Sequence, residues 1–148
     1  MLDPRALDLD VLCEAMDSHD YEISWWIDRA TGEIRPHIPD VDGNETPDAD
    51  GWTFIPPTES RDGYRDMADF AASVRDPHAA ELLGLALEGR GAFRRFRNVV
   101  FDRTELGRDW NSFRDARAVR RALDWLEVEG LITTADADEV RVQHPDPS

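Results

Sequence analysis

The chain has 148 residues, and its 41% hydrophobic and 33% charged side chains are typical of a globular protein despite a net charge of −15. A domain of this size hides roughly two-thirds of its unfolded surface, so we predict one domain over residues 1–148. No apolar run approaches the ~20 residues of a membrane span, the first residues lack the pattern of a signal peptide, and a lone cysteine, Cys13, excludes an intramolecular disulfide, so we expect a cytoplasmic protein.

The first third of the chain predicts a helix and a small sheet over residues 5–58. Leu7, Leu12 and Met16 recur at helical spacing over residues 5–17, which Asp3 and Pro4 could start. Apolar and polar residues alternate over residues 21–28, and a second β-prone run follows over residues 34–38, which predicts a hairpin. The second strand should lie at an edge or break at Pro36, because proline has no N–H to donate. Residues 39–51 are all turn formers and acids, which predicts a mobile surface loop, and residues 52–55 form a third strand.

Residues 59–130 change to helical periodicity. We predict one helix that Ser60 caps and that ends at Asp76, and three more over residues 78–88, 92–100 and 110–126. Residues 131–134 and 140–142 flank an Ala-Asp-Ala-Asp turn, so a terminal hairpin over residues 131–143 is predicted, followed by a frayed tail at 144–148. The expected fold class is therefore α+β, with a small antiparallel sheet packed on a mainly helical second half.

Three stretches of the sequence resemble a known family. They are Ile55-Pro56-Pro57-x-Glu59-Ser60-Arg61-x-x-Tyr64-x-x-Met67-x-x-Phe70, the run Leu85-Ala86-Leu87-Glu88-Gly89-Arg90-Gly91-Ala92-Phe93-Arg94-Arg95-Phe96-Arg97, and Trp110-x-x-Phe113 with Trp125-Leu126. Together with the Asp28 to Glu33 turn they are similar to Uncharacterised Protein Family 0158, small bacterial proteins, over most of residues 7–130. The resemblance implies no activity and no catalytic residues, because that family has none assigned.

The charge is unevenly distributed along the chain. All 17 basic residues are Arg, and the net charge is −15 over residues 1–89, +4 over 90–128 and −4 over 129–148. A GC-rich genome and adaptation to salt are both compatible with this composition. The basic segment either neutralises the acidic half within the fold or binds an external anion.

The turn from Gly89 to Arg97 is the first candidate binding site. Two glycines at the start of a helix, with the guanidinium groups of Arg90, Arg94, Arg95 and Arg97, could converge on a phosphate. Alternatively, the glycines form a tight helix–helix turn and the arginines pair with acids of the chain. Neither the phosphate-loop nor the dinucleotide-binding pattern is met.

The second candidate lies on the helix predicted over residues 110–126. Arg114, Arg117 and Arg121 stand at i, i+3 and i+7, so an anionic group is needed to offset their repulsion. A helix followed by Gly130-Leu131-Ile132 and a hairpin is also the order of a winged helix, which over residues 110–142 would direct Arg114, Arg117, Arg120 and Arg121 toward DNA. Acids in the predicted wing and the negative charge of the chain oppose DNA binding.

Catalytic and metal motifs find little support. Asp40-x-Asp42-Gly43-Asn44-Glu45 lacks the spacing of a calcium loop, Cys13 lies on an apolar stripe, and the four His are scattered. Trp25 and Trp26 point to opposite faces of their strand. We therefore predict no cofactor and an interaction or regulatory module that contacts an anionic protein or nucleic acid through Arg90, Arg94, Arg95, Arg97, Arg114, Arg117 and Arg121. An enzyme acting on a phosphorylated small molecule at the Gly89 to Arg97 turn is the alternative.

Overall fold

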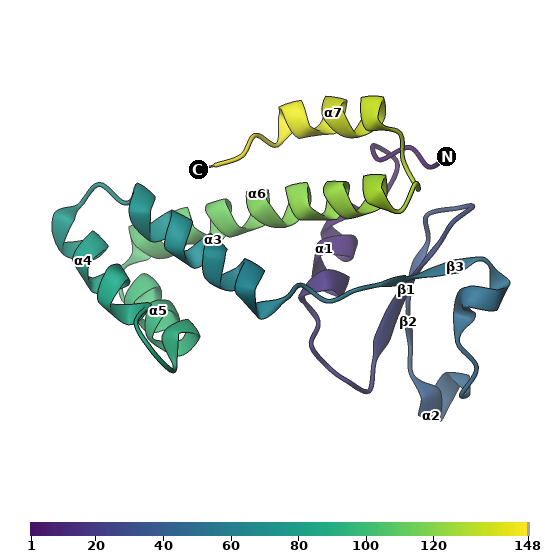
Figure 1. Cartoon of the computed structure of the whole chain (residues 1–148), viewed down its shortest axis with the longest axis horizontal. Coiled ribbons are helices and arrows are strands. Elements are labelled where there is room, and N and C mark those ends of the chain that lie inside the picture. Colours follow the sequence, from purple (N-terminus) through teal and green to yellow (C-terminus); the bar gives the residue numbers. More distant parts are fainter. Residues whose placement is uncertain (148) are drawn as a thin grey trace. The chain divides into compact units, whose positions relative to one another are not determined.

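The computed structural model describes residues 1–147, the side chain of Ala49 excepted, and confirms the α+β class (Figure 1). The chain divides into two compact units. Unit 1 consists of Met1–Thr58 and Ala118–Pro145, and unit 2 of Glu59–Arg117 with Asp146 and Pro147. The prediction of one domain over residues 1–148 is not tested by this division and stays a prediction.

Unit 1 combines the sheet with helices from both ends of the chain. Its elements are α1 (Leu9–Asp17), β1 (Ser24–Asp28), β2 (Ile34–His37), α2 (Pro39–Asp42), the 3-10 helix η1 (Pro47–Asp50), β3 (Trp52–Ile55), the second part of α6 (Thr104–Val128) and α7 (Thr134–Gln143). All pairs in the sheet are antiparallel, and its order is β2-β1-β3. The predicted hairpin and third strand are thereby confirmed.

The edge position of Pro36 is confirmed as well. Pro36 on β2 lies opposite Trp25 on β1, and β2 has β1 as its neighbour on one side only among the described strands. Asp28 N donates to Glu33 O at 2.8 Å, so alternation along the ladder places Pro36 at a position whose nitrogen faces away from β1. The missing N–H of the proline therefore costs the hairpin no hydrogen bond.

The core of unit 1 lies on one face of the sheet. Ile27 and Ile55 are buried there with Leu12 of α1 and Leu123 of α6, and Trp25 packs against them. Trp26 is 7% exposed on the opposite face, where its ring meets Phe54 edge-on at 5.5 Å. The two adjacent tryptophans thus serve different faces, as strand alternation predicts.

Unit 2 is helical and has a core of its own. Its elements are α3 (Ser60–Ser73), α4 (Pro77–Ala86), α5 (Ala92–Phe101) and the first part of α6. Four rings, those of Phe70, Phe96, Trp110 and Phe113, meet mostly edge-on in its centre, with Phe96 and Trp110 centroids 4.9 Å apart. Within residues 1–147 no helix is both long and apolar enough to cross a membrane.

The predicted terminal hairpin over residues 131–143 is wrong, because this segment contains the helix α7. The Thr133 hydroxyl accepts a hydrogen bond from Asp136 N at 3.1 Å and caps its start. Ala137 and Val140 are buried while Val142 is 81% exposed. Burial therefore follows the helical i, i+3 spacing and not the alternation of a strand.

Several boundaries also differ from the prediction. Asp8 caps α1 through a hydrogen bond from Val11 N, so this helix starts later than residue 5. Glu59 precedes α3, which makes Ser60 its first residue and not its cap. The predicted loop 39–51 contains α2 and η1, and its mobility stays a prediction.

Candidate functional site

Arg117, one of the predicted site residues, is enclosed within unit 2. Its side chain is 13% exposed, and its nitrogens form ion pairs with Asp66 at 3.3 Å, Asp69 at 2.9 Å and Asp146 at 3.0 Å. The Asp66 side chain is only 5% exposed. The guanidinium also lies over the Phe113 ring, 5.0 Å from its centroid.

These carboxylates are the anionic partners that the sequence predicts for Arg117. Burial alone would lower the pKa of the Arg117 guanidinium, but the contacts with Asp69, Asp146 and Asp66 outweigh it and raise the pKa. The ion pair also ties Asp146, which lies in the predicted frayed tail, to unit 2; Ser148 lies outside the described residues. Arg117 is therefore saturated from within the chain.

The three arginines spaced at i, i+3 and i+7 do not act alike. Arg114 is 49% exposed, and its Nε lies 4.0 Å from the Asp115 carboxylate. Arg121 is half-buried, is engaged within the chain and belongs to unit 1, whereas Arg114 and Arg117 belong to unit 2. The row is thus not one shared surface of free charges.

Arg95 is committed to the backbone of the turn that precedes α5. Its Nε donates to Ala86 O at 3.1 Å, and its two other nitrogens donate to Glu88 O and Arg90 O. Carbonyls at a helix end have no partner within the helix, so one guanidinium here completes the end of α4 and fastens the turn to α5. This role matches the alternative that the turn is a helix–helix connection.

The other arginines of the turn are available. We define the α5 patch as five exposed side chains, those of Arg90, Phe93, Arg94, Arg97 and Phe101. The four on α5 fall on one arc of the helix, next to the arc of the buried Ala92, Phe96 and Val100. In the part of the chain that is described, no hydrogen bond or ion pair involves the guanidinium of Arg90, Arg94 or Arg97.

The patch lies on the less acidic part of the chain. Of the 32 acids and 17 Arg, unit 1 contains 20 acids and 6 Arg, which leaves unit 2 close to neutral. The segment from Gly89 to Phe101 contains four Arg and no acid. The α5 patch is therefore a local concentration of positive charge, bounded in the sequence by Glu88 and Asp102, in a protein whose total charge is strongly negative.

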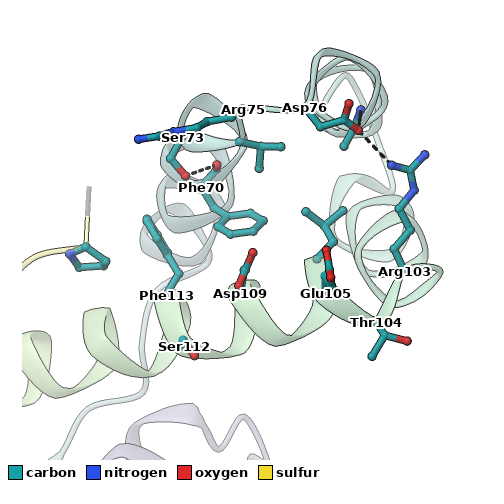
Figure 2. A pocket seen from close by; sticks show the side chains of 14 residues that line it. Phe70, Ser73, Arg75, Asp76, Arg103, Thr104, Glu105, Asp109, Ser112 and Phe113 are labelled. Atoms are coloured by element: carbon teal, nitrogen blue, oxygen red, sulfur yellow. Dashed lines mark hydrogen bonds and ion pairs between the residues drawn. The ribbon is translucent and has the colours of Figure 1, made fainter.

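Unit 2 also has an open pocket of about 790 Å³ (Figure 2). Phe70 and Phe113 form its aromatic floor, between α3 and α6. Its rim carries charged side chains, namely Arg75, Asp76, Arg103, Glu105 and Asp109. Among residues 1–147 no group of three or more His, Cys, Asp or Glu is placed to hold a metal ion.

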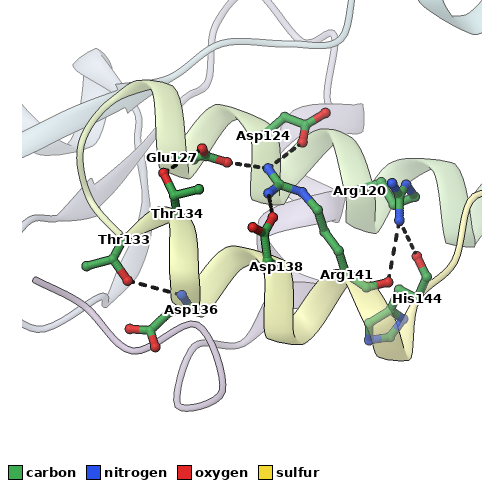
Figure 3. A network of polar contacts seen from close by, with 9 residues as sticks. All are labelled: Arg120, Asp124, Glu127, Thr133, Thr134, Asp136, Asp138, Arg141 and His144. Atoms are coloured by element: carbon green, nitrogen blue, oxygen red, sulfur yellow. Dashed lines mark hydrogen bonds and ion pairs between the residues drawn. The ribbon is translucent and has the colours of Figure 1, made fainter.

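In unit 1, arginines join α6 to α7 (Figure 3). Arg141 donates to Asp124 at 2.7 Å, Asp138 at 2.7 Å and Glu127, and Arg120 donates to His144 O at 2.9 Å. The contact with Glu127 is the main cause that raises the pKa of Arg141, and Arg141 in turn holds the pKa of Glu127 below its usual value. The winged-helix prediction over residues 110–142 fails here, since a helix replaces the wing and Arg120 caps it.

Sequence reasoning missed two features of unit 2. Glu105 and Asp109 were not singled out, although their i, i+4 spacing places both on one face of a helix. The helical apolar pattern over residues 92–100 includes Phe93 without separating it from the core, and Phe101 lies outside that predicted helix, although Phe93 is 46% and Phe101 is 53% exposed. On a helical projection both rings fall nearer to Arg97 than to the buried Phe96, and this spacing could have indicated their exposure.

Comparison with known proteins assigns the chain to a family. Residues 2–145 match an uncharacterised protein family, UPF0158. A UPF0158 protein from Pseudomonas aeruginosa is 29% identical over 129 residues, which cover 84% of this chain and 83% of that protein. No solved structure matches the chain.

Proposed function

Because the chain belongs to the uncharacterised protein family UPF0158, which has no assigned activity, we propose a function from its surface: an interaction module that binds an acidic protein segment through the α5 patch. One observation carries this proposal. Arg90, Arg94 and Arg97 have no partner within the described chain, although the chain contains 32 acids. Arg117 and Arg141 each pair with three acids of the chain. Arg65, Arg75 and Arg108 also lack a partner in the described chain, so the patch is distinguished by three such arginines gathered beside two exposed rings.

The aromatic side chains support a protein partner. Phe93 and Phe101 lie one helical turn on either side of Arg97. Their rings lie close to Gly63 of α3 and Gly107 of α6, and the part that stays exposed gives an approaching segment apolar surface beside the guanidinium groups. Arginine and aromatic residues are enriched where binding energy concentrates in protein interfaces. The acidic segment would supply carboxylates for the arginines and an apolar side chain for the rings.

The charge of the whole chain favours a short acidic segment over a nucleic acid. A long polyanion is repelled by the net charge of −15 that the whole chain carries. A segment with a few carboxylates experiences less repulsion and still pairs with three guanidinium groups.

A binding assay with defined probes tests the proposal. We expect a fluorescein-labelled peptide with alternating Glu and Leu to bind at low salt, with affinity that falls as salt rises. The double variant Arg94→Glu and Arg97→Glu should abolish binding. Arg65→Glu, a change at an exposed arginine of α3 outside the patch, should leave binding intact.

Two results would contradict the proposal. One is equal binding by the wild type and the double variant. The other is binding of a single-stranded RNA of similar length with no binding of the peptide, because that result assigns the patch to nucleic acid. Circular dichroism of both variants verifies that the helices remain formed.

A further inference from the structure

The pocket of unit 2 is rigid where it is apolar. The Phe70 centroid lies 5.3 Å from that of Trp110 and 5.4 Å from that of Phe113, and both pairs meet edge-on. Phe70 and Phe113 are 4% and 6% exposed, so their rings cannot turn without disturbing the core. A floor that is fixed before a ligand arrives costs little ordering entropy on binding.

Two of the pocket's charged groups neutralise each other. Arg103 forms an ion pair with Asp76 at 3.1 Å, and the same carboxylate accepts a hydrogen bond from Ala79 N at 3.2 Å as the cap of α4. The Arg75 side chain extends along the outside of α3, away from the Phe70 ring (Figure 2). Neither arginine therefore offers a free positive charge over the aromatic floor.

Arg75 has no partner in the described chain, but its side chain points away from the floor (Figure 2), and Glu105 and Asp109 are the unpaired acids of the pocket. They lie one turn apart on α6, and their carboxylates rise from the helix toward the level of Phe70 (Figure 2). Over residues 1–147 neither side chain forms an ion pair or a hydrogen bond with another group. The open pocket thus combines an aromatic floor with two negative charges on one wall.

We propose that this pocket binds an organic amine, with its ammonium group between Glu105 and Asp109 and its apolar body on Phe70 and Phe113. An ammonium supplies three donors, enough for both carboxylates. This site is separate from the α5 patch, and its test does not depend on the peptide assay.

Three probes with one skeleton test the sign of the charge. We titrate 2-phenylethylamine, 2-phenylethanol and 3-phenylpropionate into the isotope-labelled protein and follow backbone amide shifts. We expect the amine to bind about fivefold more tightly than the alcohol, the gain that two partly exposed ion pairs provide. The carboxylate should bind least. Saturable shifts should centre on α3 and α6 around the pocket.

Two variants and a control connect the effect to the proposed side chains. Replacing Glu105 by Gln and Asp109 by Asn keeps the shape and removes the charge, so the amine should lose its advantage over the alcohol. Replacing both by Lys should reverse the order and favour 3-phenylpropionate. Glu81→Gln, at an exposed acid of α4 outside the pocket, should change nothing.

The proposal is overturned if the alcohol or the carboxylate binds the wild type as tightly as the amine. It is also overturned if the amine shifts amides away from the pocket, or if no saturable shift occurs. Both acids are exposed, and the amide spectrum of each variant shows directly that unit 2 is folded.

Discussion

Replacing Arg117 by Met should destabilise unit 2 by about 2–4 kcal/mol, since removal of one partner of a buried ion pair costs 3–5 kcal/mol when both groups are fully enclosed. The Asp66 carboxylate, 5% exposed, would lose its contact with the guanidinium and remain buried. Asp69 and Asp146 are 41% and 50% exposed, so loss of their pairs adds only about 0.5 kcal/mol each. Met fills most of the volume over Phe113 and limits the loss of packing.

Hydrogen exchange localises this effect. Amides of α3, which carries Asp66 and Asp69, should lose about 2–4 kcal/mol of protection in Arg117→Met. The matched control is Arg114→Met, three residues earlier on α6, where the 49% exposed side chain predicts a change within about 0.5 kcal/mol. The second variant Asp66→Asn in the Arg117→Met background should recover part of the loss, because the buried charge is then removed.

A loss below about 1 kcal/mol in Arg117→Met would refute the reasoning, because it would mean that the guanidinium contributes little to keeping the Asp66 charge buried. Failure of Asp66→Asn to recover stability would do so as well. In that case the contribution of Arg117 would come from its stacking on Phe113 and not from its charge.

Two further predictions concern Arg95 and the Arg141–Glu127 pair. Arg95→Ala should lower the midpoint of urea unfolding by the equivalent of about 1–2 kcal/mol, because three contacts with carbonyls are lost. Arg94→Ala should have little effect, and equal effects of the two variants would contradict the capping role of Arg95. Arg141 lowers the pKa of Glu127 in the folded state, so this pair stabilises the protein above the usual Glu pKa of 4.5, and its contribution is lost as the pH falls through the lowered value. Glu127→Gln should therefore flatten the acid limb of the stability curve, and an unchanged limb would contradict it.

The sequence predicts the sheet and five helices of this fold because their burial follows simple periods. In β1 the alternation that predicts a strand places Ile27 on the core face and Trp26 on the other. On α5 the helical spacing correctly separates the buried Phe96 from the exposed Arg94 and Arg97. These signals are local, and a short window of sequence is enough to read them.

The terminal helix was missed for an equally local reason. The stretch from Val140 to Val142 alternates like a strand, and its two valines outweighed the helix-start signal of Thr133 followed three residues later by Asp136. That signal is the N-cap that the structure shows. A single β-branched pair is weak evidence because tertiary packing decides which of the two is buried.

Local sequence could not predict which arginines find a partner within the chain. Arg117 reaches Asp66 across 51 residues of chain, and Arg95 takes its partners from backbone carbonyls, which every sequence contains. The i, i+3, i+7 spacing correctly indicates that Arg117 needs an anion, but it makes the same prediction for Arg114 and Arg121, whose surroundings differ. Which guanidinium is satisfied depends on how distant helices pack, and this is the information that periodicity lacks.

The sheet edges have a consequence for self-association. An edge strand presents unpaired backbone groups with which other copies can pair, and within the described residues this sheet has two edge strands, β2 and β3. On β2 the positions with an outward-facing nitrogen are Ile34 and Pro36, and Pro36 has no N–H; on β3 the Trp52 carbonyl accepts a hydrogen bond from Arg29 at 3.0 Å. An incoming strand would find a donor missing at one edge and an acceptor occupied at the other, so Pro36 and Arg29 oppose strand addition at no cost to the hydrogen bonds within the sheet.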